Sequence, residues 1–105
     1  EIIGYIELMR LSGAKRKHVC TFTLLVKKEY RGMGIGQKLL ERGIQWAKEN
    51  GFIKIAISTM STNHTAIALY RKNGFTEVGR YHKQFITEEY IADEVMMELF
   101  LNGTD

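Results

Sequence analysis

The segment spanning residues 22–40 constrains the fold of this chain more than any other part of the sequence. The apolar run FTLLV enters it, and the helical pattern GQKLL leaves it. Between them Gly32, Gly34 and Gly36 stand at every second position, with Arg31 just ahead. A turn of this kind exposes backbone N–H groups at a helix N-terminus, where partial positive charge collects. The sequence therefore predicts a strand, a phosphate-holding turn and a helix, in that order.

The rest of the chain has the patterns of further strands and one further helix. After the turn, apolar residues at three- and four-residue spacing predict an amphipathic helix from residue 35 to about residue 50. A second helix is expected between Asn63 and Gly74. Residues 82–90 are polar and favour a loop or an extension of the strand before them. The strands are expected over residues 1–10, 19–26, 52–59, 75–79 and 93–100. The order β-β-α-β-α-β-β predicts an α/β fold with a mixed sheet.

Length and composition exclude several classes of protein. With 105 residues and 45% hydrophobic content, the chain is long enough for one domain with a core and too short for two. No apolar run approaches membrane-spanning length, so we expect no membrane partner. Cys20 is the single cysteine and favours a reducing compartment, so we expect a cytoplasmic protein. No Cys/His spacing suggests a metal site. The net charge of +3 is mild and lacks the dense basic stripe of a nucleic-acid partner.

Two nucleotide-binding motifs can be tested against the glycines. A dinucleotide fingerprint, G-x-G-x-x-G, would need its third glycine where Gln37 or Leu39 stands. A P-loop would need its second glycine at position 37 as well. Both motifs fail, and what remains is Arg31-x-x-Gly34-x-Gly36. A glycine-rich turn without any ligand would also satisfy this short pattern.

The pattern resembles the pyrophosphate turn of the GCN5-related N-acetyltransferases (GNAT), which is Arg/Gln-x-x-Gly-x-Gly/Ala between a strand and a helix. Two further elements resemble this family at the expected distances. One runs from Asn63 through Ala66 to the segment LYRKNGF at residues 69–75, and the other is Tyr90-x-x-Asp93-Glu94-x-x-Met97. The resemblance covers the chain from Ile3 to about Leu101, and the three elements in order make it specific.

The resemblance implies a fold and a domain arrangement. The fold is a mixed, mostly antiparallel GNAT-type sheet flanked by helices. Residues 1–105 would be a single GNAT-like acetyltransferase domain, in which residues 1–10 and 19–26 resemble the third and fourth strands of the family. We therefore expect the domain to be incomplete at its N-terminus, without the strand-helix-helix-strand part that forms much of the acceptor surface in this family.

The resemblance also implies that acetyl-CoA is the co-substrate and that no metal takes part. The pyrophosphate of coenzyme A would accept hydrogen bonds from the glycine turn, and its pantetheine arm would pair with the backbone of the strand before the turn. The positions that the resemblance assigns to coenzyme A are Leu24, Leu25, Val26, Arg31, Gly32, Met33, Gly34, Ile35, Gly36, Gln37, Lys38, Asn63, Ala66, Tyr70 and Lys72.

Tyr70 is the residue that the resemblance assigns to catalysis. A hydroxyl close to the thioester sulfur can donate a proton to the departing thiolate. The alternative is a core tyrosine, because Ala66, Ile67 and Tyr70 share the apolar face of the helix. Asn63 likewise has a structural alternative as the N-cap of that helix. Arg31 and Lys72 could equally be solvated surface cations.

The general base is not assigned by the sequence. Many family members carry a glutamate in the fourth strand, where this chain has the residues CTFT at positions 20–23. The residues His18, His64 and His82 are candidates by their ordinary pKa, and Glu94 by its charge, but no spacing argument supports any of them.

The function implied is that of an N-acetyltransferase, a transferase that moves an acetyl group from acetyl-CoA to a primary amine by direct attack in a ternary complex. The acceptor could be a small molecule or a peptide amine, and a homodimer stays open. The alternative is a non-catalytic acyl-CoA-binding module of the same fold. Thiol release with a panel of amines separates these two functions.

Overall fold

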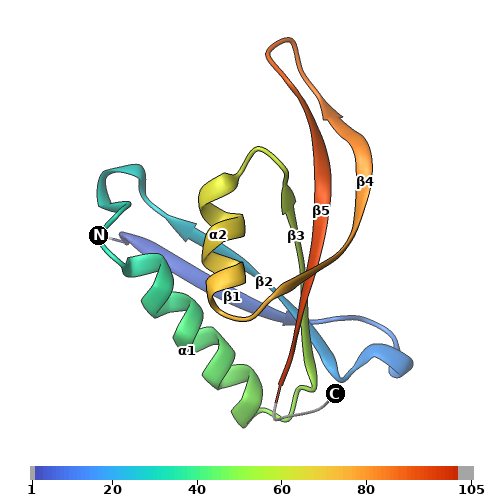
Figure 1. The fold of residues 1–105 in the computed structure, drawn as a ribbon. Coiled ribbons are helices and arrows are strands. Elements are labelled where there is room, and N and C mark those ends of the chain that lie inside the picture. The colour runs from blue at the N-terminus through green and yellow to red at the C-terminus, as the bar shows by residue number, and fades with distance from the viewer. Residues whose placement is uncertain (1, 102–105) are drawn as a thin grey trace. The chain divides into compact units, whose positions relative to one another are not determined.

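The computed structural model describes residues 2–101 as a five-stranded sheet with two α-helices (Figure 1). Hydrogen bonds join the strands in the order β1-β2-β3-β5-β4, and the observed order of elements confirms the predicted α/β arrangement. Neither helix in this part of the chain combines the length and the apolar sequence needed to cross a bilayer. The elements are β1 (Gly4–Arg10), β2 (Val19–Val26), α1 (Ile35–Glu49), β3 (Lys54–Met60), α2 (His64–Lys72), β4 (Thr76–Ile86) and β5 (Ile91–Phe100).

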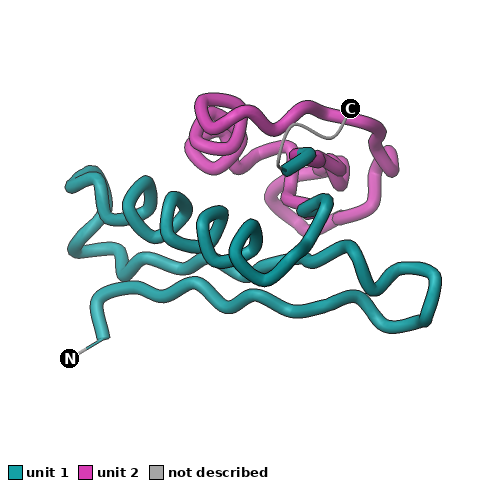
Figure 2. Tube along the Cα trace, turned by 90° about the horizontal axis from the view of Figure 1, so that it is seen from below, with its two compact units in different colours: residues 1–55, 100–105 teal, residues 56–99 magenta. Residues whose placement is uncertain are grey.

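The chain forms two compact units (Figure 2). Unit 1 comprises residues 1–55 and 100–105, and unit 2 comprises residues 56–99. Strand β3 contributes to both, because Lys54 and Ile55 belong to unit 1 and the remainder of the strand to unit 2. The single domain expected from the length of the chain stays a prediction.

In unit 1, β1 and β2 form an antiparallel pair from Gly4 opposite Val26 to Arg10 opposite Cys20. The side chains of β1 alternate between the two faces of this pair, as the period of a strand requires. Ile6 and Leu8 are half-buried on the face that α1 covers, whereas Tyr5 and its neighbours at alternate positions are exposed. One face of β1 therefore packs against α1, and its other face is exposed.

Helix α1 packs against β1 and β2 (Figure 1). A Cβ atom on Gly43 would lie 2.7 Å from Cδ1 of Ile6, so a larger residue there would force the end of the Ile6 side chain to shift. Phe52, just after the helix, stacks on Trp46 at a centroid distance of 5.9 Å. Arg10 lies over the Phe52 ring at 4.7 Å. The buried apolar residues of unit 1 are Val19, Cys20, Leu40, Ala47, Phe52, Ile55 and Leu101.

Strands β2 and β3 are parallel over a short distance. Val19 lies opposite Lys54 and Cys20 opposite Ile55, and the ladder ends there. Strand β2 nevertheless continues to Val26, paired with β1 on its other side. The last six residues of β2 therefore have β1 as a ladder partner on one edge and no β3 ladder on the other.

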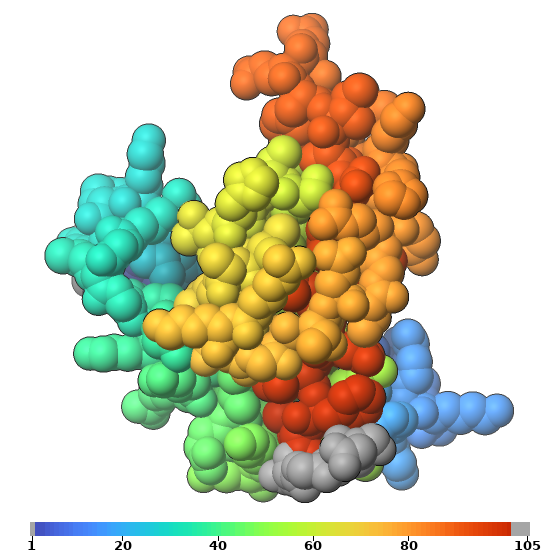
Figure 3. Space-filling model, in the orientation of Figure 1, coloured from blue at the N-terminus to red at the C-terminus, as the bar shows by residue number. Residues whose placement is uncertain are grey.

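Unit 2 contains α2, most of β3 and the β4–β5 hairpin. Tyr70 of α2 and Phe75, just after it, pack against each other at a centroid distance of 5.8 Å. The turn that joins β4 to β5 protrudes at the top of the space-filling view (Figure 3). The buried apolar residues of unit 2 are Ile57, Tyr70, Phe75, Ala92, Val95 and Met97.

The β4–β5 hairpin is longer than the sequence predicts. Strand β4 continues to Ile86, and β5 begins at Ile91. The ladder has an irregularity between Tyr81 and Phe85, where Lys83 adopts a φ of 54°. Asp93 on the facing strand accepts a hydrogen bond from the Lys83 backbone N–H at 3.0 Å. The polar sequence of residues 82–86 does not distinguish a strand from a loop. The hydrogen bond from Lys83 to Asp93, ten residues later, stabilises this part of β4.

Candidate functional site

The glycine turn between β2 and α1 adopts a backbone conformation that favours glycine at two positions. Gly32 and Gly34 have φ angles of 82° and 77°, in the left-handed region that favours glycine. A Cβ atom on either residue would meet nothing within 4 Å, so conformation and not space requires glycine here. The turn lies at the surface, at the left of the space-filling view (Figure 3).

Helix α1 begins at the end of this turn without a side-chain cap. Its N-cap is Gly34, which has no side chain to accept the first N–H groups. The first helical hydrogen bond runs from the Lys38 N–H to the Gly34 carbonyl oxygen at 3.1 Å, so no helix carbonyl receives the N–H groups of Ile35 and Gly36. The first turn holds no acidic residue. This positive helix end fits an anionic ligand such as a phosphate.

Several side chains around the turn are already committed to other groups. The Nε atom of Arg31 donates to the carbonyl oxygen of Val26 at 3.1 Å, which links the turn to the end of β2. The amide of Gln37 donates to a carboxylate oxygen of Glu41 at 2.9 Å. Lys38 and Met33 are exposed. Among the residues assigned to phosphate, Ile35 and Gly36 therefore have the clearest geometry for binding it, because no helix carbonyl receives their backbone N–H groups.

The register of β1 and β2 shows which of the strand residues assigned to pantetheine have a backbone that faces away from β1. Backbone hydrogen bonds from Lys27 to Ile3 and from Leu11 to Val19 show that the odd-numbered residues of β2 exchange hydrogen bonds with β1. The backbone of Leu25 therefore faces β1. Leu24 and Val26 face the opposite edge, beyond the end of the β3 ladder. Of the three residues expected to pair with pantetheine through their backbone, Leu24 and Val26 therefore have the suitable orientation, and Leu25 does not.

In unit 2, Asn63 caps helix α2 as its position predicts. Its side-chain oxygen accepts a hydrogen bond from the Ala66 N–H at 3.3 Å, and its amide nitrogen donates to Thr59 Oγ1 at 3.4 Å. Ala66 is half-buried, and Lys72 is exposed in the last turn of the helix. The structural role of Asn63 is therefore confirmed, and its role toward coenzyme A stays a prediction.

Tyr70 is the buried residue of α2, with 8% of its surface exposed. Burial raises the pKa of its hydroxyl above the ordinary tyrosine value, because the phenolate would lose its hydration. The group is thus held in its protonated form at neutral pH, as a proton donor requires. The same burial is what the core alternative expects, so the structure is compatible with both roles.

The remaining titratable candidates have distinct environments. Burial raises the pKa of the Cys20 thiol to about 11, which keeps it protonated and a poor nucleophile. His82 Nδ1 lies 3.4 Å from an Asp93 oxygen on the β4–β5 hairpin. Ser58 Oγ donates to Glu94 Oε2 at 2.8 Å, a pair that no sequence pattern indicates. Among residues 2–101, no three His, Cys, Asp or Glu side chains gather as metal ligands would.

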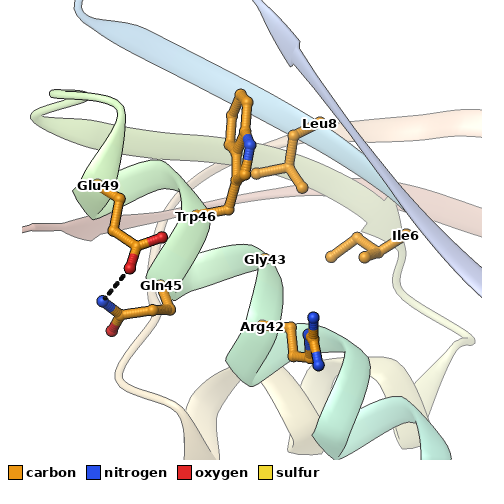
Figure 4. Close-up of a pocket in the computed structure, with 7 residues that line it drawn as sticks. All are labelled: Ile6, Leu8, Arg42, Gly43, Gln45, Trp46 and Glu49. Carbon is orange, nitrogen blue, oxygen red and sulfur yellow. Dashed lines mark hydrogen bonds between the residues drawn. The ribbon is translucent and has the colours of Figure 1, made fainter.

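A groove of about 680 Å³ lies in unit 1, beside α1 and β1 (Figure 4). Its polar rim includes Gln45, which donates to Glu49 at 3.3 Å. None of the residues assigned to coenzyme A or to catalysis lines it. The lining residues are Ile6, Leu8, Arg42, Gly43, Gln45, Trp46 and Glu49.

Comparisons with known proteins show that the chain is similar to a family of acetyltransferases. A model of the Acetyltransferase (GNAT) family matches residues 1–75. An uncharacterized N-acetyltransferase of Dictyostelium discoideum is 42% identical over 59 residues, which are 56% of this chain and 27% of that protein. N-acetyltransferase family 8 member 2 of Rattus norvegicus is 33% identical over 83 residues, 77% of this chain and 37% of that protein. The chain thus spans well under half the length of these two relatives.

Solved structures share the fold over nearly the whole chain. An acetyltransferase of the GNAT family from Streptococcus pneumoniae has a TM-score of 0.89 at 25% identity, and the match covers 96% of this chain and 61% of that one. The Salmonella typhimurium protein yncA, solved with its cofactor acetyl-CoA, has a TM-score of 0.89 at 24% identity. That match covers 97% of this chain and 60% of that one.

Proposed function

Because the chain belongs to the Acetyltransferase (GNAT) family, we propose that it transfers an acetyl group from acetyl-CoA to a primary amine. The observation that carries the proposal is the uncapped start of α1 after two glycines with positive φ. A helix end with unmatched N–H groups and no acidic residue in its first turn suits the pyrophosphate of coenzyme A. Bound acetyl-CoA would supply the activated acetyl thioester.

The residues around the turn would bind and orient this co-substrate. The N–H groups of Ile35 and Gly36 would donate to the phosphates, together with backbone groups of the glycine turn. Leu24 and Val26 would offer backbone groups to the amides of the pantetheine arm, since their backbone faces away from β1. Arg31 would hold the turn in place through Val26. In unit 2, Asn63, Ala66 and Lys72 remain proposed contacts.

Tyr70 would supply the proton that the departing thiolate needs. Its hydroxyl has the raised pKa of a buried phenol and so carries the proton at neutral pH. A neutral amine would attack the thioester carbonyl directly and release its extra proton to solvent, while the thiolate leaves with the proton from Tyr70. Because the attack is direct, the protein needs no covalent intermediate and no nucleophile of its own. The pKa of Cys20, about 11, is consistent with a mechanism that uses no cysteine nucleophile.

A matched pair of glycine variants tests the proposal. Gly34→Ala strains the turn at φ 77°, and Gly51→Ala imposes the same kind of strain at φ 79°, just past the other end of α1, with no side-chain clash at either. We expect Gly34→Ala to weaken coenzyme A binding by about tenfold or more in calorimetry, and Gly51→Ala to leave it unchanged. Equal effects on binding would contradict a phosphate site at the turn.

Release of free thiol with a panel of primary amines tests the transfer itself. Amine-dependent release by the wild-type protein supports the acetyltransferase function. Coenzyme A binding without any release would favour the alternative, a non-catalytic acyl-CoA-binding module. Failure of binding and release together would overturn both.

A further inference from the structure

In unit 2, one half-buried carboxylate has no cationic partner among residues 2–101. The carboxylate of Glu94 in β5 accepts a hydrogen bond from Ser58 of β3 at 2.8 Å, and this is the one polar contact of that side chain among residues 2–101. The neighbouring acids differ. Glu77 is paired with Arg80 at 2.8 Å, and Asp93 with Arg80 at 3.3 Å. Glu94 is thus oriented by a hydroxyl and left uncompensated in charge.

The alternation of the strands explains why the arginine does not reach Glu94. Arg80 lies opposite Val95 in the β4–β5 ladder, and Tyr81 lies opposite Glu94. Successive residues point to opposite faces, so Arg80 and Glu94 are on different faces of the hairpin. The negative charge of Glu94 therefore lies on a face that the arginine does not neutralise.

The same register places an aromatic side chain beside Glu94. Residues directly opposite each other in an antiparallel ladder share a face, with Cβ atoms about 5 Å apart. Tyr81 is 56% exposed, so its ring is accessible there. Ser58, Glu94 and Tyr81 come from β3, β5 and β4, which are consecutive in the sheet (Figure 1). A carboxylate fixed by a hydroxyl and flanked by an accessible ring is a chemistry that recognises ammonium groups.

The chemistry of acetyl transfer decides which amine group of an acceptor this carboxylate suits. The amine that reacts must lose its proton before it attacks, and a fixed carboxylate beside it would favour its protonated form. Glu94 is therefore better suited to a second ammonium group of the acceptor, one that does not react.

We propose that Ser58, Glu94 and Tyr81 bind the non-reacting ammonium group of a small diamine or polyamine acceptor. This assignment of an acceptor class rests on the proposed acetyl transfer. Glu94 and Tyr81 would touch the ammonium group, and Ser58 would position Glu94. The acceptor would then be distinguished from monoamines by its second charge.

Calorimetric binding of two amines of equal chain length tests the proposal directly. Putrescine carries a second ammonium group and n-butylamine does not. We expect the wild-type protein to bind putrescine about tenfold more tightly, as a hydrogen-bonded ion pair predicts. Glu94→Gln should abolish the difference, and Ser58→Ala should reduce it. Glu88→Gln removes the same charge from an exposed position in the β4–β5 turn and should preserve the difference.

Two results would overturn the proposal: equal binding of both amines by the wild-type protein, or a preference for putrescine that survives Glu94→Gln. In acetylation assays, Glu94→Gln should raise KM for putrescine and leave KM for n-butylamine unchanged. Absence of acetyl transfer to every amine of the panel would contradict the proposed function. The binding comparison would still decide whether Glu94 recognises the second ammonium group.

Discussion

The Nε atom of Arg31 donates a hydrogen bond to the carbonyl oxygen of Val26, 3.1 Å away. The contact joins the residue just before Gly32 to the last residue of β2, five positions earlier. An arginine ahead of a phosphate turn is readily interpreted as a charge for the phosphate. Here the Nε–H group is used on the backbone, so the residue fixes the turn as well as carrying a charge beside it.

Variants of Arg31 should separate this hydrogen bond from the charge. In Arg31→Gln the Nε2 atom stands the same number of bonds from Cα as Arg Nε, so the donor is kept and the charge is lost. Arg31→Met loses both. We expect Arg31→Met to weaken coenzyme A binding about tenfold and Arg31→Gln to weaken it much less, measured by calorimetry. Equal losses that shrink at high salt would instead identify the charge as the decisive property.

Tyr70→Phe should lower kcat about a hundredfold or more while the dissociation constant of coenzyme A changes little, because only the proton donor is lost. Initial rates of thiol release and calorimetry check the two quantities. Tyr5→Phe, at an exposed position of β1, is the matched control and should change neither. Unchanged kcat in Tyr70→Phe would remove the hydroxyl from the mechanism and leave Tyr70 as a core residue.

Asn63→Ala should destabilise the protein by about 1 kcal/mol, because the side-chain oxygen that accepts from the Ala66 N–H is lost. Asn63→Asp keeps an accepting oxygen at the same place and should stay near the wild-type stability. Urea denaturation measures both. If Asn63→Asp folds normally but binds coenzyme A poorly, the residue also contacts the ligand, whereas unchanged binding would restrict it to capping.

The acid stability of the protein should depend on Asp93. The Lys83 backbone N–H, followed by the Arg80 side chain and His82, lowers the pKa of its carboxyl in the folded state. The unfolded chain takes up this proton near pH 4, before the folded protein does. The stabilisation is therefore present above about pH 4 and is lost as the pH falls through the lower folded pKa.

Replacing Asp93 by Asn should remove that dependence. We expect urea midpoints of Asp93→Asn to fall less steeply than those of the wild-type protein as the pH is lowered below about 4. Glu88→Gln removes a carboxylate from the exposed hairpin turn and should keep the wild-type slope. The same slope in Asp93→Asn and wild type would contradict the assigned role of the carboxylate.

Local patterns were sufficient for the glycine turn, α1 and α2. The turn requires positive φ at Gly32 and Gly34, and the cap of α2 lies three residues from its partner N–H, so each feature is encoded within a few positions. The apolar spacing of α1 is equally local. The order of elements followed from these patterns.

Contacts between distant segments were not predictable in the same way. The far end of β4 is polar, and it stays in the sheet because Asp93 holds the Lys83 backbone. Ser58 and Glu94 are 36 positions apart and meet only through sheet pairing. Which backbone groups of β2 face away from β1 depends on a register that its side chains do not specify.

The early end of the β2–β3 ladder has a consequence for how this molecule can be studied. The groups that Leu24 and Val26 present on that edge are amides and carbonyls, identical in every amino acid except proline. Alanine scanning of the strand would leave these backbone groups intact, so their hydrogen bonds to a ligand would cause no change in the measured affinity. Amide-to-ester replacement in a semisynthetic chain, which deletes a single N–H donor, would expose what side-chain mutagenesis cannot detect.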